Sequence, residues 1–129
     1  MDQYAIVKSA SLLPMMVRGF LIISFVVIGG CQSGSASKHA GSLEMDSKYV
    51  AEVCSEIEKG QLLEFRFISN IPVKFNLHYH EAEAEVEIVG KRSTESFKHA
   101  VSLDSTQEYC LTWTAISNST KIIYEYTFH

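Results

Sequence analysis

The feature that most constrains the fold is a strict alternation of apolar and polar side chains. In the segment 73–81 every second residue is apolar: Val73, Phe75, Leu77 and Tyr79. A period of two residues is that of a β-strand with one face buried, whereas a helix repeats every 3.6 residues. The same alternation recurs in four more segments, 62–69, 83–89, 109–115 and 121–128. The chain therefore predicts an all-β domain.

Turn-forming residues separate these segments. They fall at 58–61, 70–72, 90–93, 104–106 and 117–119. The segment 49–57 is compatible with a short helix or a strand, and its Tyr, Val and Ile favour the strand; a weaker strand is expected over 97–103. About seven short strands with turns between them indicate an antiparallel β-sandwich over residues 49–129.

A basic residue and a short apolar run precede this domain. Arg18 is followed by the apolar run 20–28 and then by Ile28-Gly29-Gly30-Cys31. The run is shorter than the roughly 20 residues that span a bilayer, but it suits the central region of a cleaved signal peptide, about 7–15 residues. The last four residues resemble the bacterial lipobox. We expect a lipoprotein signal peptide over 1–30, with acylation of Cys31; the start may be read at Met1, Met15 or Met16.

Cleavage before Cys31 would leave an acidic protein. It would remove two of the 11 basic and one of the 15 acidic side chains, and 9 − 14 gives a formal charge of −5. This charge disfavours nucleic acid as a partner, so attachment to the lipid bilayer is expected through the acyl chains. Gln32 after the cysteine favours the periplasmic face of the outer membrane. Segment 31–48, rich in Ser, Gly and Ala, is predicted to be a flexible tether.

Two further cysteines remain once Cys31 is acylated. Cys54 and Cys110 would then form an even pair in an exported, oxidising compartment, where a disulfide is the default expectation.

The cysteine pair and two strand segments resemble a group of small bacterial exported proteins. These proteins carry a Phe-Asn-Ile/Leu-His-Tyr-His strand, as in 72–80, and a later Tyr-Cys-Leu-x-Trp strand, as in 108–114. The layout is also similar to the GOLD domain of secretory-pathway cargo receptors, which implies a jelly-roll-like sandwich with one disulfide. The coiled coil and membrane span of those receptors have no counterpart here, so their cargo role is not implied.

Two histidines are the candidate metal ligands. His78 and His80 stand two residues apart, so they share the polar face of one strand and can converge on a divalent metal ion. A third ligand could come from His99 or from one of the nearby acidic residues Glu81, Glu83, Glu85 and Glu87. The alternatives are ordinary surface histidines, or histidines that contact a polar ligand or a partner's carboxylate.

The sequence leaves three functional hypotheses. The first is a non-enzymatic envelope lipoprotein that binds an unknown protein or small molecule or has a structural role. The second is a metal-binding periplasmic protein that uses His78 and His80. The third is an inhibitor of an exported enzyme such as lysozyme. No catalytic residue is predicted, since the chain has no Gly-rich phosphate loop, Ser-elbow or Cys-x-x-Cys motif.

Overall fold

The protein is described by a computed structural model that covers residues 4–8 and 36–129. Its described elements are all β-strands, which confirms the predicted all-β class. They are β1 (Tyr4–Lys8), β2 (Ser37–Met45), β3 (Val50–Ile57), β4 (Leu62–Glu81), β5 (Ala84–Ser102), β6 (Gln107–Ala115) and β7 (Thr120–Phe128). Among these residues, no helix is long and apolar enough to cross a bilayer.

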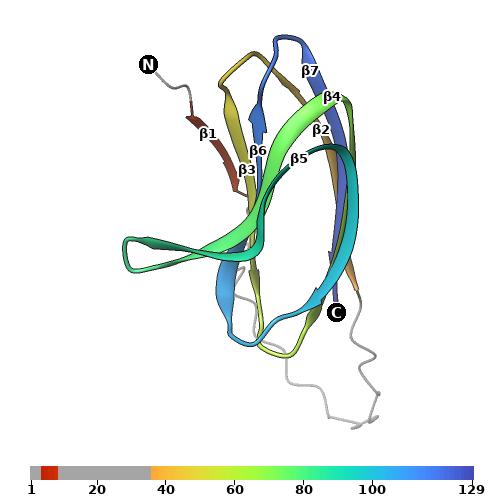
Figure 1. Ribbon diagram of the computed structural model, residues 1–129. Helices are drawn as coiled ribbons and strands as arrows, with labels where there is room; N and C mark the ends of the chain where they lie inside the picture. The colour runs from red at the N-terminus through yellow and green to blue at the C-terminus, as the bar shows by residue number, and fades with distance from the viewer. Residues whose placement is uncertain (1–3, 9–35) are drawn as a thin grey trace, which may run out of the picture.

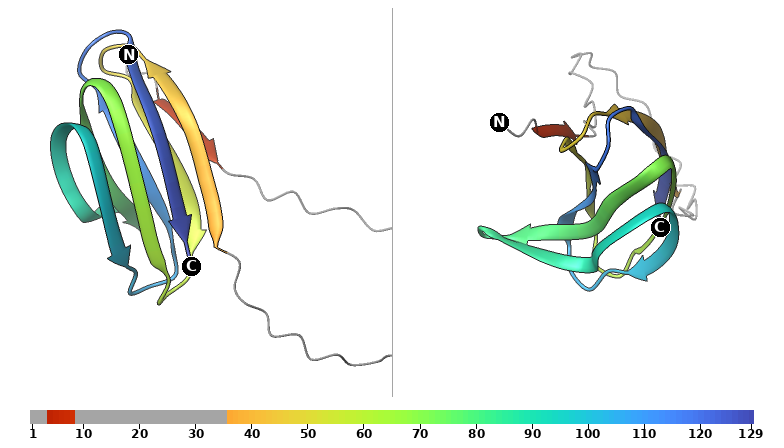
Figure 2. Two further views of the ribbon diagram at one scale, coloured as in Figure 1. Left: turned by 90° about the vertical axis from the view of Figure 1, so that its right-hand side faces the viewer. Right: turned by 45° about the horizontal axis from the view of Figure 1, so that its top comes forward.

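One long strand, β4, organises the sheet. The strand order is β1-β3-β6-β4-β7-β2, and β5 also pairs with β4. The first half of β4 pairs with β7 and the second half pairs with β6. Because β4 passes from one neighbour to the other, the sheet curls into two layers around a shared interior (Figures 1 and 2). The first layer holds β2, β7 and the start of β4; the second holds β3, β6 and the end of β4.

The alternating apolar residues of 62–69, 73–81, 109–115 and 121–128 fill this interior, as the sequence predicts. The prediction is wrong for 83–89, where Ala84 and Ile88 are exposed and Val89 is buried instead. Trp113 of β6 is fully buried and packs edge-on against Phe67, with ring centroids 5.7 Å apart. The Phe75 ring packs against both, with centroids 4.8 Å from Phe67 and 5.7 Å from Trp113. Other core members come from both layers, among them Val53, Leu63, Phe65, Val73, Leu77, Leu111 and Ile122. Each such side chain contributes roughly 1.5–3 kcal/mol when fully buried.

The predicted disulfide is present between neighbouring strands. Cys54 of β3 and Cys110 of β6 stand opposite each other in the antiparallel register, with Cα atoms 4.1 Å apart. Both belong to the strand positions that alternate with the core residues Val53 and Leu111, so the bond lies on the outer side of the second layer.

The flexible tether predicted over 31–48 is wrong for half of its length. Residues Ser37–Met45 form β2, which pairs along its whole length with β7. The strand could not be recognised from its small and polar residues. An edge strand is held mainly by backbone hydrogen bonds and buries few side chains, so its sequence shows little apolar alternation. Leu43 packs against the core and Met45 is part of it, while the His39 ring stacks on Tyr126 with centroids 4.6 Å apart.

Two of the predicted turns do not end a strand. Segments 70–72 and 90–93 lie inside β4 and β5, which run together as one long hairpin. The pairing shifts between Ile68 and Val73, which places Pro72 in the irregular stretch where a missing N–H can be tolerated. The two segments coincide with places where the pairing of β4 with β5 shifts, between Ile68 and Val73 and between Phe75 and Leu77.

Only residues 4–8 of the predicted leader lie within the described part of the chain. Residues Tyr4–Lys8 pair in parallel with Val50–Cys54 of β3. The apolar run 20–28 and the acylation site Cys31 lie outside the described residues, so cleavage and lipid attachment stay predictions.

Candidate binding cleft on the outer face of the second layer

A polar group is buried on the outer face of the second layer. Alternation along β4 places Asn76, His78 and His80 on this face, beside Glu52 of β3 and Thr112 of β6. His78 is only 1% exposed, Asn76 4%, Glu52 6% and Thr112 8%. Such burial is unusual for polar residues on the outside of a sheet and marks the face as a candidate site.

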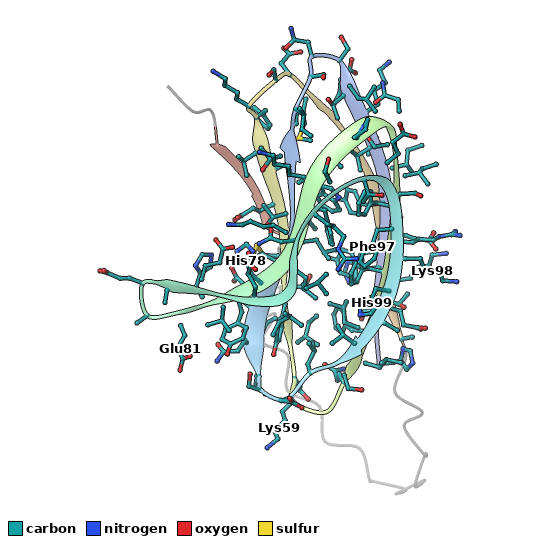
Figure 3. All side chains as sticks on the ribbon, viewed as in Figure 1. Lys59, His78, Glu81, Phe97, Lys98 and His99 are labelled. Carbon is teal, nitrogen blue, oxygen red and sulfur yellow. A yellow bond between two sulfur atoms is a disulfide. The ribbon has the colours of Figure 1, made fainter. Side chains whose placement is uncertain are left out.

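These side chains line an open cleft of about 400 Å³, here called the polar cleft. Its wall includes Glu52, Asn76, His80 and Thr112, and β5 contributes Glu85 and Lys91. His78 lies next to it at the base of the β4–β5 hairpin (Figure 3).

A chain of hydrogen bonds fixes the form of the buried histidine. Thr112 Oγ1 donates to Glu52 Oε1 at 3.4 Å and lies 3.3 Å from His78 Nδ1. Because the hydroxyl proton is directed to the carboxylate, which only accepts, we assign the proton of His78 to Nδ1, which donates to Thr112. The Nε2 atom of His78 then carries a free lone pair.

That lone pair faces two other ligand-type atoms. His78 Nε2 lies 3.2 Å from His80 Nε2 and 3.7 Å from Glu52 Oε1. The two rings are nearly perpendicular, with centroids 4.8 Å apart. His78 Nε2 is thus close to a nitrogen donor of His80 and to an oxygen donor of Glu52.

Burial lowers the pKa of His78 below its ordinary value of 6.5. The carboxylates of Glu85 and Glu52 oppose this shift, and the positive charges of His80 and Lys91 add to it. Since desolvation is the largest cause, His78 is neutral at neutral pH, the form in which imidazole acts as a hydrogen-bond acceptor or a metal ligand.

Side chains of β5 form the outer rim. Glu85 Oε1 accepts a hydrogen bond from Asn76 Nδ2 at 2.8 Å. Lys91 Nζ lies 3.9 Å from Glu85 and 3.7 Å from Glu87. Both glutamates are partly exposed, so this rim can rearrange without disturbing the buried group.

The structure separates the predicted third ligands into two groups. Glu85 and Glu87 approach the cleft, whereas Glu81 and Glu83 are exposed at the end of the hairpin. His99 lies on β5 opposite Phe65 in the first layer and stacks on the Phe97 ring. It belongs to a different surface.

Sequence reasoning missed Glu52. This residue lies in the segment 49–57, which the sequence left open between a short helix and a strand. The missing information was the strand order, because only the pairing of β3 with β6 and of β6 with β4 brings Glu52 toward His78.

Cysteine sulfur does not add to this donor set. Within the described residues, donor atoms of Glu52, His78 and Cys110 lie within 4.8 Å of one another, as do those of Cys54, Glu108 and Cys110. Both cysteines are joined in the disulfide, so neither offers the thiolate that binds metal ions.

Comparison with protein-family models and with curated protein sequences gave no match. The structure is similar to the crystal structure of PliG from Aeromonas hydrophila, a periplasmic lysozyme inhibitor of g-type lysozyme. The similarity covers 100% of both chains with a TM-score of 0.61, at 10% sequence identity. The two proteins therefore share a fold.

Proposed function

We propose that this chain is an exported, non-enzymatic protein that binds and inhibits a lysozyme in the periplasm. The observation that carries the proposal is the full-length similarity of fold to PliG, whose partner is a g-type lysozyme. The leader predicted over 1–30 would export the chain to the same compartment. Acylation of Cys31 would then hold the inhibitor at the outer membrane, close to the cell wall that lysozyme cleaves.

The molecule has the rigidity that a protein inhibitor needs. The disulfide joins β3 to β6, and the aromatic core fixes both layers against each other. A surface that is already ordered loses little conformational entropy on binding, which favours affinity.

The β4–β5 hairpin is the element most suited to contact the enzyme. It extends away from the two layers (Figure 1) and carries the exposed Glu81 and Glu83 at its end. The chain from Cys31 has a formal charge of −5, so the whole protein is expected to attract a basic partner. Lysozyme cleaves its substrate with a pair of carboxylates, which would repel this acidic tip. We therefore place the hairpin against cationic surface around the enzyme's cleft.

An inhibition assay tests this function. The purified exported protein is mixed with g-type lysozyme and with lysozymes of other types, and the clearing of a suspension of bacterial cells is followed. We expect stoichiometric inhibition of one type. The double variant Glu81→Gln/Glu83→Gln should slow association several-fold at low salt, because rim charges act mainly on the association rate.

The matched control removes the same charge elsewhere. Glu56→Gln/Glu58→Gln alters exposed residues at the end of β3 and in the turn after it. This variant should inhibit like the unmodified protein. Full lysozyme activity in the presence of excess inhibitor, for every lysozyme type, would contradict the proposed function. Equal effects of the two double variants would reject the hairpin as the contact surface.

A further inference from the structure

We propose that His78, His80 and Glu52 form a binding site for a divalent transition-metal ion of the zinc type. This site stands on the contacts of the polar cleft alone and does not require the chain to inhibit lysozyme.

The spacing of the donor atoms is the first support. In a tetrahedral zinc site with Zn–N distances of about 2.0–2.1 Å, neighbouring ligand atoms are about 3.3–3.4 Å apart. The two Nε2 atoms are separated by 3.2 Å, and His78 Nε2 lies 3.7 Å from Glu52 Oε1. His80 is exposed, so its ring can turn toward Glu52 without unpacking the core.

The orientation of His78 is the second support. Its Nδ1–H donates to Thr112, and the Thr112 hydroxyl donates in turn to Glu52. Metal-binding histidines commonly donate their second ring N–H to an oxygen atom, which fixes the ring and aims the other nitrogen at the metal. Thr112 supplies that oxygen here.

The charge balance of the cleft is the third support. Glu52 is 6% exposed, and within residues 36–129 the basic side chain within 4 Å of its carboxylate is that of His78, which is neutral. Buried carboxylates are normally paired with a cation or bound to a metal. A divalent ion between Glu52 and the two imidazoles would neutralise the carboxylate and use both nitrogen lone pairs.

The cleft also leaves a position for a fourth ligand. With three protein ligands the remaining position would face the open volume of about 400 Å³, where a water molecule or an external group can bind. The rim residues Glu85 and Lys91 are partly or largely exposed, so their side chains can turn toward solvent and admit the ion.

The test is a titration of the purified exported protein with Zn²⁺ alone, followed by calorimetry, after treatment with a chelator. We expect saturable binding of one ion per chain and a higher melting temperature with zinc, because the ion binds the folded state. Co²⁺ should give the visible absorption bands of a four-coordinate site.

Two substitutions locate the ion. His80→Ala changes an exposed ligand and leaves the core intact, and Glu52→Gln keeps the shape of the side chain. Each should weaken zinc binding by about tenfold or more. The matched control His99→Ala removes a histidine of the first layer and should leave binding unchanged.

The proposal is overturned if the unmodified protein shows no saturable zinc binding. It is equally overturned if His80→Ala, shown by circular dichroism to be folded, binds zinc as tightly as the unmodified protein. Loss of lysozyme inhibition with zinc binding retained would reject the proposed function and leave this site standing.

Discussion

At the scale of single residues, Gly41 has the clearest structural requirement. It stands opposite Tyr124 in the pairing of β2 with β7. A Cβ atom at this position would lie 2.5 Å from the Tyr124 hydroxyl oxygen and 2.7 Å from the ring carbon that bears it. The ring cannot move freely, because it packs on Trp113 with centroids 5.2 Å apart.

We therefore predict that Gly41→Ala lowers the free energy of unfolding by about 1–3 kcal/mol through overpacking. Chemical denaturation of the two proteins measures this difference. Gly90→Ala is the matched control, since its Cβ would meet only Glu87 Oε2 at an ordinary 3.6 Å. Equal stability of Gly41→Ala and Gly90→Ala would show that the Tyr124 ring gives way at no cost.

A second residue-scale prediction concerns Glu125. Its pKa lies below the ordinary value of 4.5, chiefly because the side chain of Arg66 donates a hydrogen bond to it at 2.6 Å. Because the pKa is lower in the folded than in the unfolded state, the stability that this ion pair contributes is fully present above about pH 4.5. This contribution is lost as the pH falls through the pKa of the folded state.

Arg66→Gln should thus raise the pKa of Glu125 toward its ordinary value, as measured by NMR titration of the carboxyl carbon. Lys38→Gln is the control; Lys38 Nζ lies 3.8 Å from Glu125, so its removal should have the smaller effect. The opposite ranking of the two variants would refute the assignment of Arg66 as the main cause.

Along β4, β6 and β7, alternation alone could predict which face each residue occupies, whereas in β5 it wrongly placed Ile88 inward in place of Val89. It placed His78 and His80 together on a polar face, and the structure has them there with their Nε2 atoms 3.2 Å apart. It could not predict that this face is buried, or that Glu52 joins it. Both facts depend on which strands are neighbours, and a two-residue period carries no information on strand order.

At the scale of whole elements, β2 is the strand that sequence reasoning missed. Its pairing with β7 covers the edge of the first layer and places Met45 in the core. The strand was hidden because its residues are small or polar and its apolar positions are few. By contrast, β6 and β7 carry several buried large side chains each, and their predicted bounds agree closely with the structure.

The prediction at this scale is a comparison of two truncated chains. A chain that begins at Tyr49 lacks β2, leaves the edge of β7 unpaired and exposes Tyr124 and Tyr126. It should lose the cooperative thermal transition and aggregate, because open apolar edges pair with other chains. A chain that begins at Gln32 keeps β2 and should melt cooperatively by circular dichroism. If the chain that begins at Tyr49 stays monomeric and melts cooperatively, β2 is dispensable for folding, as a flexible tether would be.

At the scale of the whole molecule, the disulfide limits the unfolded state. Cys54 and Cys110 are 56 residues apart in sequence. In the chain-entropy model, closing a loop of that length stabilises the fold by about 4 kcal/mol. The pairing could be predicted from the cysteine count and the predicted export signal, without any knowledge of strand order.

The double variant Cys54→Ala/Cys110→Ala should therefore unfold at clearly lower denaturant concentration than the oxidised protein, with a loss of about 4 kcal/mol. Guanidinium denaturation followed by Trp113 fluorescence measures the loss. An unchanged midpoint would mean that the aromatic core holds the two layers together without the covalent link.

Isothermal titration calorimetry measures the proposed binding to a lysozyme. The purified protein is titrated into g-type lysozyme, and the enzyme activity is measured at each ratio. We expect a saturable complex of one inhibitor with one enzyme and a loss of activity in step with its formation. Absence of binding heat at several temperatures, with full enzyme activity in excess inhibitor, would contradict it.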